Sequence, residues 1–90
     1  LHYYQKALEF NPTNATIYYK IAEVLNTTAK QDDVLKASLS IETAIRYEKK
    51  NKFFYLLAIY IYNNLTRFDK SAQMYEQLIT EVEGSEEYLF

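Results

Sequence analysis

The sequence has no cysteine and no tryptophan, and it has only one glycine and one proline among its 90 residues. Without cysteine there is no disulfide, no thiolate metal site and no cysteine nucleophile. A single glycine excludes a glycine-rich loop for phosphate groups. So few turn-forming residues also argue against a many-stranded sheet. These absences favour long helices joined by short turns.

The residues that are present suit a folded helical chain. Hydrophobic residues make up 49% of the sequence and aromatic residues 17%, which is too much apolar mass for a disordered protein. The net charge is −2, and no cluster of arginines gives the basic surface that nucleic acids require. The longest apolar run, residues 53–62, is about half as long as a helix that crosses a bilayer. We therefore expect no nucleic acid partner and no membrane insertion.

The one proline marks the first helix boundary. Pro12 cannot lie inside a helix, and it disfavours helical geometry at Asn11, so a first helix ends near Phe10. Asn14 can cap a second helix that begins at Ala15. The sequence thus places a tight turn between two helices.

Capping residues predict three further helices. Asp32 or Asp33 is the expected cap of a third helix that runs to residue 48. A fourth helix spans residues 52–64. Thr66 and Asp69 resemble a capping box at the start of a fifth helix, which ends near residue 84.

Apolar residues recur at spacings of three and four and define an inward stripe on each helix. The stripes are Ile17, Tyr18, Ile21, Ala22 and Leu25; Leu35, Ala37, Ile41, Ala44 and Ile45; Phe54, Leu57, Ala58 and Ile61; and Ala72, Tyr75, Leu78, Ile79 and Val82. Similar segments recur after 34 to 37 residues, with a shift of 34 expected between the third and fifth helices. Two helices per period of this length indicate a helical solenoid.

The opening segment HYYQKALEFNPTN resembles the second helix and closing turn of the tetratricopeptide repeat, including the Tyr, Ala and Pro of that unit. The first helix of the family unit carries a large aromatic residue, a Leu-like residue beside a small one, and another large residue. Two segments fit this description, namely Tyr18, Ile21, Ala22 and Leu25, and Phe54, Leu57, Ala58 and Ile61. The resemblance implies an all-α fold of about five helices, with antiparallel helix hairpins stacked in a right-handed superhelical solenoid.

The same resemblance divides residues 1–90 into parts of one repeat array. Residues 1–14 form the second helix of a truncated repeat, 15–50 and 51–84 form two repeats, and 85–90 start a further helix. Each hairpin leaves an apolar face open, so we expect flanking repeats of the same chain on both sides.

The resemblance also implies a function, because the family mostly binds peptides or helices on a concave face that the first helix of each unit lines. The positions concerned are Thr16, Tyr19, Lys20, Glu23, Asn26 and Thr27 in one unit, and Lys52, Tyr55, Leu56, Ile59, Tyr62 and Asn63 in the next. We expect partner contacts from eight of these residues: Tyr19, Lys20, Glu23, Lys52, Tyr55, Leu56, Ile59 and Tyr62. Among them, Tyr55, Leu56, Ile59 and Tyr62 are expected to form an exposed apolar lining.

Two alternatives stay open. A neighbouring helix of the same array could bury the apolar lining, which would then be core and not a binding surface. The whole segment could also serve as an architectural or regulatory arm of a larger protein instead of a scaffold that binds a partner protein or peptide.

The sequence predicts no enzyme, no catalytic residue, no cofactor and no metal. His2 is the only histidine, and it has no second histidine or cysteine to act with. The glutamates of residues 81–87 straddle Gly84 and form no metal cage. Asn14, Asn26 and Asn64 open N-x-Thr sequons, but loops rich in Asn and Thr explain them equally well, so we assign no compartment.

Overall fold

A computed structural model describes residues 2–82, which fold into helices and contain no strand. The helices are α1 (His2–Phe10), α2 (Ala15–Asn26), α3 (Gln31–Tyr47), α4 (Lys52–Asn64) and α5 (Phe68–Gln77), the last continuing as a π-helical segment, η1 (Leu78–Val82). The predicted all-α architecture of five helices is confirmed. The further helix predicted from residue 85 lies outside the described residues.

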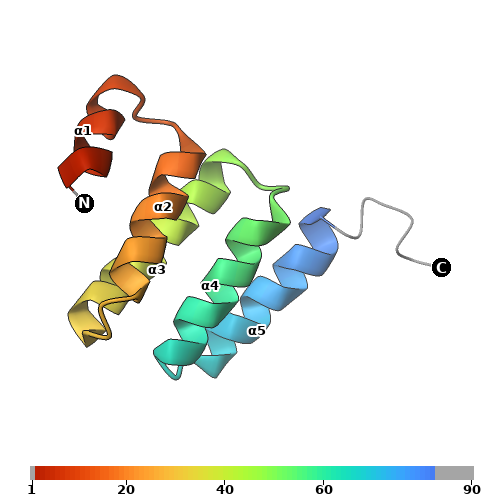
Figure 1. Ribbon diagram of the computed structural model, residues 1–90. Helices are drawn as coiled ribbons and strands as arrows, with labels where there is room; N and C mark the ends of the chain where they lie inside the picture. The colour runs from red at the N-terminus through yellow and green to blue at the C-terminus, as the bar shows by residue number, and fades with distance from the viewer. Residues whose placement is uncertain (1, 83–90) are drawn as a thin grey trace.

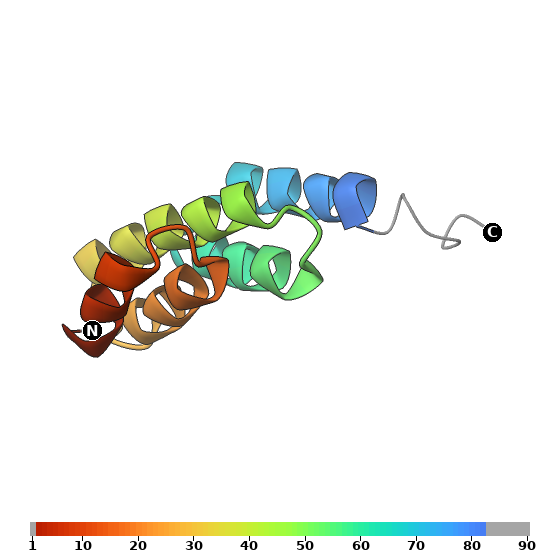
Figure 2. The same ribbon diagram turned by 90° about the horizontal axis from the view of Figure 1, so that it is seen from above.

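The helices form two layers. In Figure 1, α2 and α4 lie side by side in front, and α3 and α5 lie behind them. Figure 2 shows the same two layers from above. Successive helices contact one another, α1 with α2, α2 with α3, α3 with α4 and α4 with α5. The front layer therefore consists of the first helix of each hairpin, as the predicted concave face requires.

Asparagine side chains start both helices of the front layer. Asn14 Oδ1 accepts hydrogen bonds from the backbone N–H groups of Thr16 and Ile17 at 3.0 and 3.3 Å. Asn51 Oδ1 accepts one from the backbone N–H of Phe53 at 3.0 Å. Each asparagine satisfies backbone donors that the first helical turn leaves without partners. The cap predicted at Asn14 is confirmed, and Asn51 repeats it.

A tyrosine four residues after each capping asparagine closes the same turn. The Tyr18 O–H donates to the carbonyl of Pro12 at 2.9 Å, and the Tyr55 O–H donates to the carbonyl of Lys49 at 2.8 Å. Each bond reaches back six residues, from the first turn of the helix to the turn that precedes it. The pair of bonds fixes how α2 and α4 are rotated about their axes as they leave the turn.

The helix bounds give the length of the repeat. α2 and α4 begin at residues 15 and 52, α3 and α5 begin at residues 31 and 68, and α1 and α3 end at residues 10 and 47. Each of these pairs is 37 residues apart. The structural repeat is therefore 37 residues long.

The core runs between the two layers and contains four fully buried alanines, Ala22, Ala37, Ala44 and Ala58. Small side chains let packed helices approach closely. The stripes predicted on α2 and α4 are buried or half-buried. On α3 the prediction holds except at Leu35, which is exposed, while Val34 and Ser38 are buried instead.

The stripe predicted on the fifth helix is wrong in phase. Its buried residues are Ser71, Met74 and Leu78, whereas Ala72, Tyr75 and Ile79 are exposed and Val82 is half-buried. The buried three stand 37 positions after the buried Val34, Ala37 and Ile41 of α3. The expected shift of 34 was taken from apolar character alone, and it rotated the helix so that only Leu78, which is buried, and Val82, which is half-buried against the core, were placed correctly.

The predicted caps of the third and fifth helices are also wrong. α3 begins at Gln31, so Asp32 and Asp33 lie in its first turn, and Lys30 at the cap position makes no side-chain cap bond. The Thr28 hydroxyl organises this turn instead, accepting from the Lys30 N–H at 3.3 Å and donating to Asp33 at 2.9 Å.

The α4–α5 turn differs from the expected capping box as well. α5 begins only at Phe68, after Arg67. Thr66 lies in the left-handed region, at φ 55°, and Asp69 pairs with Arg67 at 3.3 Å. Neither side chain makes the reciprocal bonds of a capping box, because Thr66 is part of the turn and not its last residue.

Removing the Tyr55 hydroxyl tests the turn bond. We expect Tyr55→Phe to lower the unfolding free energy by about 1 kcal/mol, because the carbonyl of Lys49 loses the partly buried bond from the Tyr55 O–H. This corresponds to a fall of about 4–8 °C in Tm for a domain of this size, measured by circular dichroism. Tyr60→Phe is the matched control, since Tyr60 is exposed. Equal Tm values for the two variants would contradict a stabilising role for this bond.

Two alanine substitutions test the phase of the helices. Ala58 is fully buried, so Ala58→Leu adds three heavy atoms to a packed core. We expect the unfolding free energy to fall by about 1–3 kcal/mol through overpacking. Ala72→Leu makes the same change on the exposed side of α5 and is expected to leave Tm within a few degrees of the parent value. A large loss of stability in Ala72→Leu would mean that Ala72 is buried, as the 34-residue shift predicted.

Candidate protein-binding site

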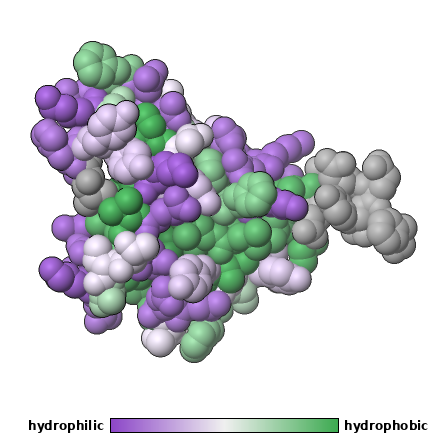
Figure 3. All heavy atoms as spheres, viewed as in Figure 1, coloured by the Kyte–Doolittle hydropathy of each residue, from purple (hydrophilic) through white to green (hydrophobic). Residues whose placement is uncertain are grey.

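The front face of α2 and α4 carries the candidate site. Figure 3 shows this face, with hydrophobic side chains gathered over α4 and hydrophilic side chains around them. The exposed members on α4 are Phe53, Leu56 and Tyr60, with 59%, 47% and 59% of their surface accessible. Their spacings of three and four residues place them on one side of the helix. We call these three residues the α4 row; Leu57 and Ile59 flank it, half-buried.

Two residues expected in the exposed lining are buried. Tyr55 retains 1% of its accessible surface and Tyr62 retains 5%. Tyr55 bonds the turn carbonyl, and the Tyr62 O–H donates to the carboxylate of Glu42 on α3. Both rings thus face into the core, and their assignment to an exposed lining is corrected.

The physical reason is a rotation of α4 by one residue relative to the expectation. The asparagine caps align α4 with α2 at a shift of 37, so the front positions Thr16, Tyr19 and Glu23 correspond to Phe53, Leu56 and Tyr60. The prediction aligned α4 with α2 at a shift of 36 residues. That alignment also placed Leu56 on the front face, but it placed Lys52 and Ile59 there instead of Phe53 and Tyr60. Lys52 is exposed at the start of α4, and Ile59 is half-buried.

The residues expected on α2 lie on the front face and form its polar side. Tyr19 is half-buried and stacks on Phe54 of α4, with ring centroids 5.0 Å apart. Lys20 and Glu23 form an ion pair at 3.6 Å, and Lys20 Nζ lies 5.8 Å from the Tyr19 ring. Burial raises the pKa of Tyr19, and the negative charge of Glu23 and its hydrogen bond add to this effect.

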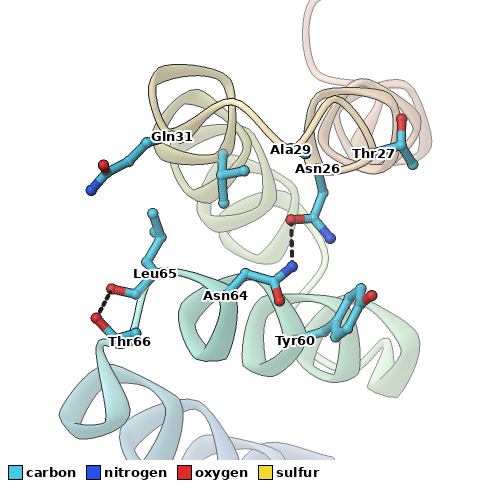
Figure 4. Close-up of a pocket in the computed structure, with 9 residues that line it drawn as sticks. Asn26, Thr27, Ala29, Gln31, Tyr60, Asn64, Leu65 and Thr66 are labelled. Atoms are coloured by element: carbon cyan, nitrogen blue, oxygen red, sulfur yellow. Dashed lines mark hydrogen bonds between the residues drawn. The ribbon is translucent and has the colours of Figure 1, made fainter.

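A hollow of about 580 Å³ opens where α2 and α4 end. Its polar lining comes from Asn26, Thr27, Gln31, Tyr60, Asn64 and Thr66. Figure 4 shows these side chains around the gap between the two hairpins, with Asn26 on α2 and Asn64 on α4 facing each other. No charged side chain lines the hollow. Tyr60 belongs both to this hollow and to the α4 row, so the two features are continuous.

Sequence reasoning missed the exposed Phe53 and Tyr60 and the place of Asn64 in the lining of the hollow. The signal that identifies them is the spacing between Asn14 and Asn51, which fixes the register of the second unit. The sequon asparagines all have structural roles, since Asn14 caps α2 and Asn26 and Asn64 bond each other.

The described part of the chain offers no metal centre, because residues 2–82 contain no group of three His, Asp or Glu side chains placed to hold an ion. His2 is exposed on α1. None of the helices described here has both the length and the apolar character that a membrane crossing needs.

Residues 3–37 match the family model of the tetratricopeptide repeat. The match supports a tetratricopeptide repeat in this part of the chain. The match spans α1, α2 and the first part of α3, which includes the capped turn at Asn14. Repeats of this family generally mediate protein–protein interactions and typically serve as scaffolds without catalytic activity. No curated protein and no solved structure matches the chain.

Proposed function

We propose that this tetratricopeptide segment is a protein-interaction module whose front face binds a peptide or helix of a partner protein. The observation that supports the proposal is the α4 row, in which three large apolar side chains of one helix face solvent together. Grouped exposed apolar side chains with a polar rim are typical of protein contact surfaces.

The surroundings of the α4 row suit this role. The Lys20–Glu23 pair lies on the α2 side, and Lys52 lies at the start of α4 with its Nζ 5.6 Å from the Phe53 ring. Exposed ion pairs contribute little affinity, but they set which sequences fit. The apolar row would supply the binding energy, and the rim would select the partner.

A specific observation favours the second candidate, an architectural arm within a larger protein. Phe68 and Tyr75 of α5 and Ile79 of η1 form a second exposed apolar row. Ile79 stands 37 positions after Glu42, the α3 residue that bonds Tyr62 of α4. A following repeat that packed on α5 as α4 packs on α3 would cover this row. Flanking repeats, and the division into residues 1–14, 15–50, 51–84 and 85–90, stay predictions.

Selection of displayed peptides on the immobilised protein tests the binding module. We expect 12-residue peptides to be enriched. We expect Leu56→Ala to weaken the binding of the selected peptides about tenfold, a loss of about 1.4 kcal/mol in binding free energy. Leu39→Ala is the matched control, because Leu39 is 70% exposed but lies on α3 in the other layer.

Two results would count against the module. One is the absence of any enriched peptide, which would favour the architectural arm. The other is equal weakening by Leu56→Ala and Leu39→Ala, which would mean that the α4 row is not the contact surface. Circular dichroism of both variants checks that the fold is retained.

A further inference from the structure

A small cavity lies between the two helices of the back layer. α3 and α5 each pack on α4, but among the helices described here their backbones do not approach each other. A cavity of about 310 Å³ opens between them, over the first turn of α4. This volume is at the low end of the range for small-molecule sites. We call this space the α3–α5 cavity.

Charged side chains of both signs line the α3–α5 cavity. Glu42 and Arg46 come from α3, Lys49 from the α3–α4 turn and Glu81 from η1. The two carboxylates belong to half-buried residues, whereas both basic residues are exposed. Burial raises the pKa of Tyr55 in the cavity wall, and the charge of Glu81 adds to this rise, so the Glu81 carboxylate lies near the Tyr55 ring. The acids are therefore more enclosed than the bases.

None of the four charges forms an ion pair within the described part of the chain. Glu42 and Arg46 stand four residues apart on α3, a spacing at which opposite charges commonly pair. The Glu42 carboxylate instead accepts a hydrogen bond from the Tyr62 O–H. Within the same part of the chain, Arg46, Lys49 and Glu81 have no charged partner either. Charges of both signs are thus held apart around one space.

The preceding unit shows that the repeat does not need these charges. At the positions 37 residues earlier, only one of the four residues is charged, and its sign is the opposite one. In the order Glu42, Arg46, Lys49 and Glu81, the earlier residues are Gln5, Glu9, Pro12 and Ala44. The apolar wall is retained, since Leu8 and Tyr18 precede Ile45 and Tyr55 by the same interval. Packing explains the wall but not the charges.

The lining favours a small ligand that carries both charges. Two carboxylates attract an ammonium group, and a guanidinium beside an ammonium attracts a carboxylate. The lining is neutral overall, so the attraction of an ion of one sign is offset by the charges of the same sign. The buried Ile45 and Tyr55 provide a wall for an apolar ligand body. The volume equals that of about ten water molecules, which suits a molecule of about ten non-hydrogen atoms.

From these observations we infer that the α3–α5 cavity binds a free α-amino acid with an apolar side chain. The ammonium group lies at Glu42 and Glu81, and the carboxylate lies at Arg46 and Lys49. The inference goes beyond the proposed function, because the cavity lies between the back helices and the α4 row lies on the front face. Since α3 and α5 do not approach each other directly, a bound amino acid would link the two units.

Three compounds with the same carbon skeleton test the need for both charges. L-Leucine carries an ammonium group and a carboxylate, isocaproate lacks the ammonium group, and isoamylamine lacks the carboxylate. Each is titrated into the isotope-labelled chain, and the backbone amide signals are followed by NMR. We expect leucine to shift the signals of Lys49 and Glu81 with a Kd of about 1 mM. The other two compounds are expected to bind at least about tenfold more weakly.

Removal of single charges tests the location of the site. Arg46→Gln and Glu81→Gln are each expected to weaken leucine binding about tenfold, because each removes a charged partner of the ligand. Lys50→Gln and Glu76→Gln are the matched controls, since both residues are exposed and neither lines the cavity. The controls are expected to keep the affinity within about twofold. Circular dichroism checks that all four variants are folded.

Three results would overturn the inference. The first is the absence of saturable shifts with leucine. The second is binding of isocaproate or isoamylamine as tight as that of leucine, and the third is equal weakening by the cavity variants and their controls. Either of the last two would mean that surface charges attract ions without a defined site. The effect of Leu56→Ala on peptide binding is measured separately, so each of these results leaves the proposed function standing or falling on its own test.

Discussion

The turn between α3 and α4 is the constraint on which the front face depends. Asn51 fixes where α4 begins, and the bond from the Tyr55 O–H to the carbonyl of Lys49 fixes its rotation. Side chains one residue apart on a helix differ in direction by about 100°. A rotation of that size would exchange core and surface residues along the whole of α4. The same two bonds at Asn14 and Tyr18 set α2, so one local device orients both helices of the front layer.

The burial of Tyr55 has opposite effects on stability and on binding. Its ring fills space between α4 and neighbouring helices, and its hydroxyl satisfies a turn carbonyl, so it strengthens the fold. Burial raises the pKa of Tyr55, and the charge of Glu81 adds to this effect. Because the ring is buried, it is not available to a partner. The proposed contact surface on α4 consists instead of Phe53, Leu56 and Tyr60, which are exposed.

Much of the fold follows from the sequence, because local rules decide it. Pro12 and Asn14 mark the first turn unambiguously, and the limits of α4 were predicted to the residue. The phase of α5 and the exposed side of α4 could not be obtained in this way. Both helices are apolar on more than one side, so periodicity alone does not show which stripe is buried. For α4 the deciding information is the bond from Tyr55 to the carbonyl six residues earlier, which no periodic pattern reveals.

The two units contribute unequally to the front face, and the proposed contact surface lies on the second of them. At positions where α4 has Phe53, Leu56 and Tyr60, α2 has Thr16, Tyr19 and Glu23. The apolar row is thus a property of the second unit and not a requirement of the repeat. Residues that the fold does not need, placed together on one face, are better explained by an external contact than by packing.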